Sequence, residues 1–199
     1  MGPRNRLGAL FLEASSEITK LMDGFYSNIE DGLFEKVYAN EDRNEQQRIV
    51  ELMREIRLRR SVLVRTFLQH IQKNTEDWIL ERGRSDSLEA QAQAEGIASR
   101  CSAHFVPLLQ SISERIAHAA DREPDREHFP ISPERITYHF IMSCRSLSLD
   151  RDAVYVVEDL FDRFVLGRLG AVYGKMNSQL MEAGFLTVVE RAKLSATSV

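Results

Sequence analysis

The sequence predicts an all-α fold, an irregular bundle of about six helices, several of them long, with a seam near residues 121–131. Two observations support this prediction. Apolar residues recur every three or four positions along most of the 199 residues, which is the spacing of one face of an α-helix. No stretch of the sequence alternates apolar and polar residues in the manner of a half-buried strand.

Four helices are predicted in the first half of the chain. An amphipathic helix begins at Leu7 and ends near residues 24–28, and a shorter helix begins around Asp31. A long helix covers residues 49–78, and a fourth covers about 87–120. The residues expected to end or break these helices are Gly24, Gly83, Ser85 and Pro107.

The second half begins with the charged, proline-interrupted segment "DREPDREHFPIS". After it, Ser132 as N-cap and Pro133 in the first turn are typical of a helix start. The last long helix should run from an N-cap at Asp150 to about Ala183, with Gly184 ending it. We therefore expect one helical domain over residues 1–199, which consists of subregions 1–120 and 132–190 and a linker-like tail, 191–199, leading to a missing output domain.

Composition and charge exclude several classes of protein. With 43% hydrophobic residues the chain can bury a core, so disorder is not expected as its main state. The formal net charge of -4 gives no overall attraction to nucleic acid or to an anionic membrane. Neither a bilayer-spanning run nor a signal peptide is present, so we expect a cytoplasmic protein. In that reducing compartment Cys101 and Cys144 should be small buried hydrophobes.

Three glycines, Gly167, Gly170 and Gly174, recur at intervals of three and four in "FVLGRLGAVYGKMNSQL". A phosphate-binding loop needs glycines directly after a strand and before a helix, whereas these lie inside a helical pattern. Each costs about 1 kcal/mol relative to alanine in a helix interior unless close backbone packing recovers it. We therefore predict that a second helix, from the same fold or from a twofold partner, packs against this stripe. The alternative is a solvated surface on which the glycines are merely tolerated.

A cluster of arginines occurs in "MREIRLRRSVLVR", where Arg54, Arg57 and Arg65 fall along one side of the long helix. This side could bind an anion or an acidic partner, although interspersed glutamates favour an ordinary ion-paired surface. Arg60 differs because it falls on the apolar face of that helix, where an arginine needs a carboxylate or carbonyl partner. The partners predicted for it are Asp159 or Asp162.

No constellation of residues points to a reaction, a metal or a cofactor. Cys101 with His104, and His139 with Cys144, could supply four zinc ligands from two helices, but the close paired spacings of zinc sites are missing. The serine elbow, the catalytic cysteine context and the carboxylate in an apolar setting are missing as well. We expect no catalytic residues, no cofactor and no metal, and therefore a protein that is not an enzyme.

Two segments of the chain carry a family resemblance. They are "DGLFEKVYANEDRNEQQRIVELMREIRLRR" and "ISPERITYHFIMSCRSLSLDRDAVYVVEDLFDRFVLGRLGAVYGKMNSQLMEAGFL". They resemble a bacterial family of uncharacterised domains that is often mislabelled thymidine phosphorylase and whose longer members frequently end in a PilZ domain. The resemblance covers about residues 18–186. Its matching positions are Leu33, Phe34, Arg57, Arg60, Ser132, Pro133, Leu160, Phe161, Asp162, Tyr173, Asn177, Leu180 and Gly184.

The resemblance implies a role in cyclic di-GMP signalling, because PilZ domains bind that dinucleotide. It links the ligand to the full-length protein, since Arg122 and Arg126 match the spacing of the PilZ arginines only by chance and no cyclase G-G-D-E-F loop is present. The chain resembles an N-terminal regulatory domain of such a protein or of a diguanylate cyclase. Thymidine phosphorylase activity is not expected.

Two functions of different classes follow. In the first, the chain is a non-enzymatic module that dimerises or docks a protein partner, and so controls or localises a C-terminal cyclase or PilZ output domain. In the alternative, the side with Arg54, Arg57 and Arg65 binds nucleic acid or a nucleotide. The salt dependence of binding distinguishes these two functions, because phosphate contacts weaken steeply with added salt and apolar packing does not.

Overall fold

A computed structural model describes residues 2–39, 41–83, 85–126, 128–145, 147 and 151–197, and it confirms the all-α prediction. Within these ranges the chain forms eight α-helices and one 3-10 helix, and no strand. None of these helices is long and apolar enough to cross a membrane. The elements are α1 (Pro3–Ala39), α2 (Arg43–Ile79), α3 (Leu88–His104), α4 (Val106–Ala120), α5 (Pro133–Cys144), α6 (Arg151–Phe164), η1 (Leu166–Arg168), α7 (Leu169–Glu182) and α8 (Val188–Thr197).

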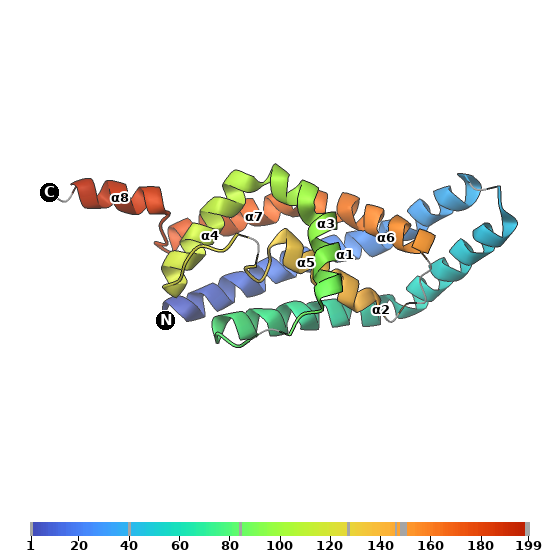
Figure 1. Ribbon diagram of the computed structural model, residues 1–199, viewed down its shortest axis with the longest axis horizontal. Coiled ribbons are helices and arrows are strands. Elements are labelled where there is room, and N and C mark those ends of the chain that lie inside the picture. Colours follow the sequence, from blue (N-terminus) through green and yellow to red (C-terminus); the bar gives the residue numbers. More distant parts are fainter. Residues whose placement is uncertain are drawn as a thin grey trace.

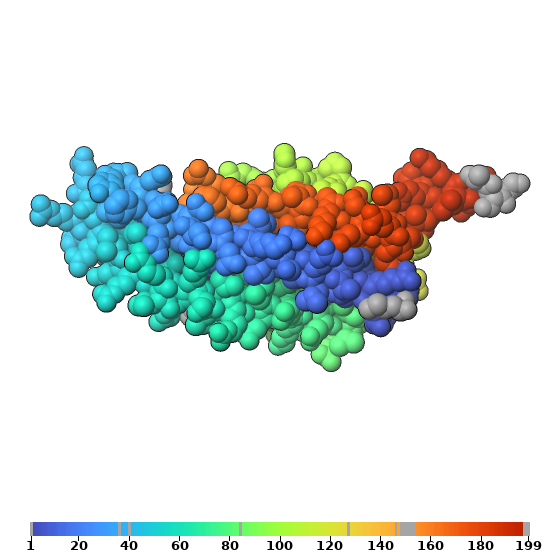
Figure 2. All heavy atoms as spheres, turned by 180° about the vertical axis from the view of Figure 1, so that it is seen from behind, coloured from blue at the N-terminus to red at the C-terminus, as the bar shows by residue number. Residues whose placement is uncertain are grey.

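Helices α1 and α2 form an antiparallel hairpin that runs the length of the molecule (Figure 1). Each has 37 residues, which corresponds to about 55 Å of helix. Helices α4, α6 and α7 pack on α1, while α2 makes its extensive contacts with α1 and α5. Seen from behind, α1 lies between α2 and α7, and α2 forms one long edge (Figure 2). One side of α2 therefore faces away from the other described helices.

The main apolar core takes residues from both sides of the predicted seam. The ring of Phe25 in α1 meets the rings of Phe140 and Phe161 edge-on, at centroid distances of 5.6 and 6.0 Å. Phe140 and Phe161 stack on each other at 3.8 Å. The seam between α4 and α5 is a loop, as expected, but its residues Phe129 and Ile131 are buried. This loop therefore contributes to the core.

The predicted helix end near residues 24–28 is wrong, because α1 continues through it. Phe25 and Ile29 are fully buried, so the apolar face does not stop at Gly24. The side-chain amide of Asn28 donates to the carbonyl oxygen of Gly24 (2.7 Å), a bond within the helix. Burial of this face outweighs the low helix propensity of glycine.

The C-terminal end of α2 differs in detail from the prediction. The helix ends at Ile79, and the residue that takes a positive φ is Glu81 (56°), whereas Gly83 was expected to end it. Arg122, from the loop after α4, donates to the carbonyl oxygen of Trp78 (2.9 Å) and to the Glu81 carboxylate (3.0 Å). Its guanidinium also lies over the Trp78 ring. A residue remote in sequence therefore satisfies this helix end.

Several local signals are confirmed. Pro107 breaks the helical pattern, and α3 and α4 meet at Phe105. Ser132 is the N-cap of α5, where its hydroxyl accepts a backbone N–H bond of 3.3 Å. Gly184 follows α7 with φ at 83°. The predicted N-cap Asp150 lies outside the described residues.

The predicted continuous helix over 150–183 is wrong, since η1 separates α6 from α7. Val165, Leu166 and Leu169 are all fully buried around this break. The backbone tightens at this break, where the Arg168 N–H donates to the Val165 carbonyl oxygen (3.0 Å) in a turn that contains Gly167, a residue of low helix propensity.

The tail that was predicted to be linker-like is helical in its described part, because residues 191–197 belong to α8. Thr187 and Glu190 form a reciprocal cap at the start of this helix: the Glu190 backbone N–H donates to the Thr187 hydroxyl (3.3 Å), and the Thr187 backbone N–H donates to the Glu190 carboxylate (2.8 Å). This capping box is a strong helix start.

Candidate functional site

Two of the arginines predicted as interaction residues join α2 to α1. Arg57 donates to both carboxylate oxygens of Glu30, with 2.9 Å from Nε, and these bonds lower the pKa of Glu30. The Arg60 guanidinium lies 3.6 Å from the Asp23 carboxylate and donates to the Asp23 carbonyl oxygen (3.3 Å). Exposed pairs of this kind are worth about 0–1 kcal/mol each. Their main effect is to fix the register of the hairpin.

Arg60 has acceptors, as its position on the helix requires, but the predicted partners Asp159 and Asp162 are wrong. Asp162 pairs with Arg100 of α3 (2.5 Å). Arg60 lies at the edge of the apolar face, where its side chain is 42% exposed and reaches out beside α1. The position of Arg60 in the helix correctly places its backbone near the core. Its side chain is long enough to carry the guanidinium out to the surface.

The opposite side of α2 carries the other two arginines among exposed apolar residues. Leu58 is 74% exposed, Val62 54% and Val50 51%. At 100° per residue, these three side chains and Arg54 and Arg65 fall within an arc of about 120° that faces away from the core. In the part of the chain that the structure describes, neither arginine has a carboxylate within ion-pair distance. We call these five residues the α2 outer face.

Close packing occurs at one of the three glycines. A Cβ added to Gly170 would lie 2.8 Å from the ring of Phe105, at the junction of α3 and α4. At Gly174 an added Cβ would meet nothing within 4 Å, and at Gly167 it would meet only the Asp162 carbonyl oxygen at 3.4 Å. Gly167 lies in η1 rather than inside an α-helix. Against the described residues, the three glycines therefore make one close contact, at Gly170, and form no continuous groove.

The cysteines weighed as metal ligands or nucleophiles are buried and free of disulfides. Burial raises the pKa of both the Cys101 and the Cys144 thiol to about 12. A thiol with such a pKa is a poor nucleophile at neutral pH. Among the described residues, no three His, Cys, Asp or Glu side chains gather in the manner of metal ligands.

A polar cavity between α2 and α5 was not predicted from the sequence. Its wall contains Arg135, which is only 4% exposed. The Arg135 guanidinium donates to the Asp86 carboxylate (2.8 Å) and to the Asn74 side-chain oxygen (2.9 Å), and it lies over the Tyr138 ring at 4.7 Å. The available signal in the sequence was the i, i+4 spacing of Arg135 and His139, which places both residues on one side of the helix.

A second buried arginine, Arg115 of α4, holds the start of α8. It donates to the Asn177 side-chain oxygen (3.0 Å), the Phe185 carbonyl oxygen (2.6 Å) and the Glu190 carboxylate (2.8 Å). The backbone bond from Thr187 and the Arg115 bond lower the pKa of Glu190 to about 2. Beyond this anchor α8 projects from the body of the molecule (Figure 1).

Comparison with known proteins identifies the family of this chain. The model of the family described as "Protein of unknown function (DUF1631) N-terminal domain" matches residues 4–184. The chain belongs to this family. No curated protein and no solved structure matches it. The matched region contains α1 to α7 and ends before α8.

In this DUF1631 N-terminal domain, most positions that carried the family resemblance are packing residues. Leu33, Phe161, Tyr173 and Leu180 are fully buried. Asn177 binds the buried Arg115 instead of facing an open site. The resemblance therefore reflects how the helices pack, and the exposed surface has to be judged from its own chemistry.

Proposed function

We propose that this chain is a non-enzymatic regulatory module that associates with a second copy of itself through the α2 outer face. Single exposed apolar residues are normal on a protein surface. Here Leu58, Val62 and Val50 share one side of a long helix that no other described helix covers. Arg54 and Arg65, which have no ion pair among the described residues, accompany them. Apolar side chains together with arginine are typical of protein interfaces.

The same face is complementary to itself in an antiparallel, twofold arrangement. When Leu58 lies opposite Val62 of the second copy, the helical register places Arg65 opposite Glu55 of that copy, a carboxylate that also pairs with Arg59 on its own helix (3.5 Å). Because the interface is isologous, both contacts occur twice. The apolar contacts then supply the association energy, and the charge pairs set the register.

Nucleic-acid binding by the side with Arg54, Arg57 and Arg65 has less support. Arg57 is held by Glu30. The remaining two arginines stand about three turns apart, with Leu58 and Val62 between them. A surface that follows a phosphate backbone needs a denser set of cations.

The wider role in this proposal comes from the family. A family described as an N-terminal domain favours a module that belongs to a longer protein. As part of the same proposal, the module controls or localises a cyclase or PilZ output domain in cyclic di-GMP signalling, and the dinucleotide acts on the full-length protein rather than on this chain.

Light scattering on a sizing column, over a concentration series and in low and high salt, tests the self-association. We expect the mass of a dimer that persists in high salt. Leu58→Asp should give a monomer, whereas Leu12→Asp should remain dimeric, because Leu12 is 61% exposed on α1 and lies outside the α2 outer face. A wild-type chain that stays monomeric at every concentration, or equal effects of the two variants, would refute the proposal.

A further inference from the structure

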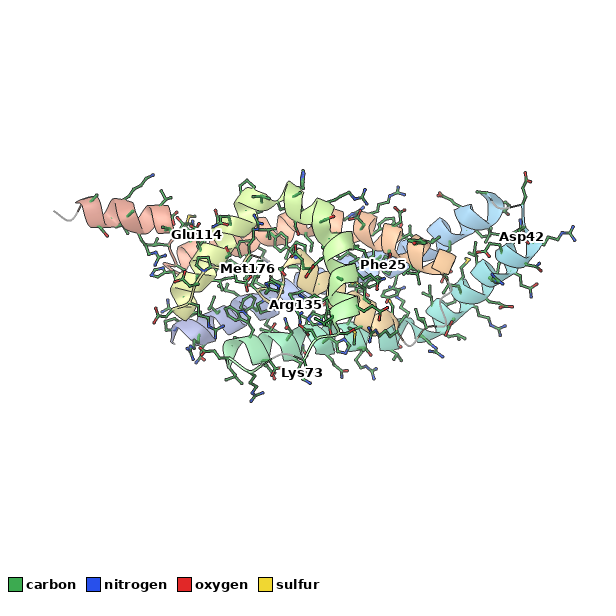
Figure 3. The ribbon with its side chains drawn as sticks, viewed as in Figure 1. Phe25, Asp42, Lys73, Glu114, Arg135 and Met176 are labelled. Carbon is green, nitrogen blue, oxygen red and sulfur yellow. The ribbon has the colours of Figure 1, made fainter. Side chains whose placement is uncertain are left out.

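The cavity between α2 and α5 has the dimensions and walls of a small-molecule site. Its volume is about 360 Å³, within the range of ligand pockets. One wall comes from α2, with His70, Lys73 and Asn74, and the other from α5, with Arg135 and His139. Figure 3 shows Arg135 inside the molecule and Lys73 at its edge on α2.

Among the described residues, the charges around the cavity leave one cation available for a ligand. Both carboxylates in its wall are engaged: Asp77 pairs with Arg82 (3.4 Å), and Asp86 pairs with Arg135 (2.8 Å). Lys73 is exposed and has no carboxylate partner among the described residues. Its ammonium group therefore gives the cavity a positive charge that no carboxylate of the described residues pairs with.

A hydrogen-bonding group lies beside this charge. His70 is one turn before Lys73 on the same side of α2, and its Nδ1 is buried without a hydrogen-bond partner in the described part of the chain. Buried polar atoms almost always have a partner, which a ligand or a water can supply. The His139 ring lies 6.0 Å from the His70 ring, centroid to centroid.

The polar wall is already held in place. The Asn74 side chain accepts from Arg135 (2.9 Å) and donates to the Pro130 carbonyl oxygen (3.5 Å). The Tyr138 hydroxyl accepts the backbone N–H of Ser87 (3.2 Å), which fixes the ring beneath the Arg135 guanidinium. A preformed wall lowers the entropy cost of binding.

We propose that this cavity binds a small ligand through an oxyanion, a carboxylate or a phosphate group, with the Lys73 ammonium as its charge partner and the His70 imidazole as its hydrogen-bond donor. The rings of Tyr138 and His139 and the thioether of Met142 supply the less polar wall for the rest of the ligand. This site is separate from the α2 outer face and does not depend on self-association.

Titration with inorganic phosphate and, separately, with acetate tests the site by NMR of the histidine side chains, with chloride holding the ionic strength constant. We expect the His70 and His139 signals to move in a saturable way with at least one of the two anions, and the tighter anion identifies the group. Lys73→Gln should weaken that binding about tenfold, the effect of one charge-assisted hydrogen bond.

Arg48→Gln is the matched control, because it removes a positive charge from an exposed position of the same helix that lies outside both the cavity and the α2 outer face. It should leave the affinity unchanged. Equal weakening by the two variants, movement of the signals with chloride alone, or no movement with either anion would overturn the site. His70→Ala gives a second test, since it removes the donor and leaves Lys73 in place, and it should weaken the binding measured from the His139 signals by up to about tenfold, the effect of one hydrogen bond.

Discussion

The two sides of α2 show how one residue type serves two purposes on one helix. Toward α1, the guanidinium groups of Arg57 and Arg60 bind Glu30 and Asp23 and hold the hairpin together. On the α2 outer face, Arg54 and Arg65 accompany exposed leucine and valine side chains. Helical spacing alone places all four arginines on one helix, and only the neighbouring helix distinguishes those that bind within the chain from those that can bind outside it.

The largest effect on the free energy of unfolding should come from removing an apolar side chain, and only on the side of α2 that packs against the core. Phe67 is fully buried, so Phe67→Ala should lower the free energy of unfolding by about 3–5 kcal/mol. Leu58→Ala on the outer side should change it by less than about 0.5 kcal/mol. Urea unfolding of the two variants at a concentration where the chain is monomeric measures the difference. Similar losses at the two positions would mean that the outer side is packed.

The second largest difference in the free energy of unfolding should be between removal of a buried arginine and removal of an exposed one. Arg115 is buried with three acceptors, so Arg115→Ala should cost about 2–4 kcal/mol. Arg57→Ala, at an exposed pair, should cost about 0–1 kcal/mol. Urea unfolding of the two variants measures both losses. Equal losses of unfolding free energy would contradict the role of Arg115 as the anchor of α8.

Substitution of Gly174 and Gly170 by alanine should also change the free energy of unfolding differently at the two positions, by smaller amounts. Gly174→Ala should raise the free energy of unfolding by about 0.5–1 kcal/mol, since the position is helical and open. Gly170→Ala should not stabilise the chain, because the added methyl group would meet the Phe105 ring. Thermal unfolding compares the two. Stabilisation at Gly170 would show that Phe105 moves freely.

Low pH should weaken the ion pair between Arg115 and Glu190 that anchors α8. The pKa of Glu190 is lowered from 4.5 to about 2, so its contribution to stability is complete above about pH 4.5 and is lost as the pH falls toward 2. Glu190→Gln should remove this part of the pH dependence. Unfolding measured between pH 2 and about pH 6 tests it, and an unchanged slope in the variant would contradict the assignment.

Features coded by neighbouring residues could be predicted from the sequence, and features made by remote residues could not. The break at Pro107 and the cap at Ser132 depend on local backbone chemistry, and both are present. The continuation of α1 past Gly24, the partner of Arg60 and the arginine that caps α2 depend on which helices meet. The α8 capping box was local and visible as Thr187 and Glu190, but the small polar composition of the tail concealed it.

The candidate sites follow the same division. Spacing found the arginines of α2, yet exposure and ion pairing, which select Arg54 and Arg65, required the hairpin. The cavity brings His70 of α2 beside His139 of α5, residues far apart in the chain. Each was only an isolated polar residue in an apolar pattern until the two helices were placed together.

A distance between two copies tests the central claim most directly. Cys101 and Cys144 are buried, with pKa values raised to about 12, so a cysteine introduced as Ser61→Cys beside Leu58 and Val62 can be spin-labelled selectively. Packed helices lie about 8–10 Å apart, and with the label arms we predict an inter-copy distance of about 20 Å. The absence of any inter-copy interaction at concentrations where the chain is dimeric would contradict association through the α2 outer face.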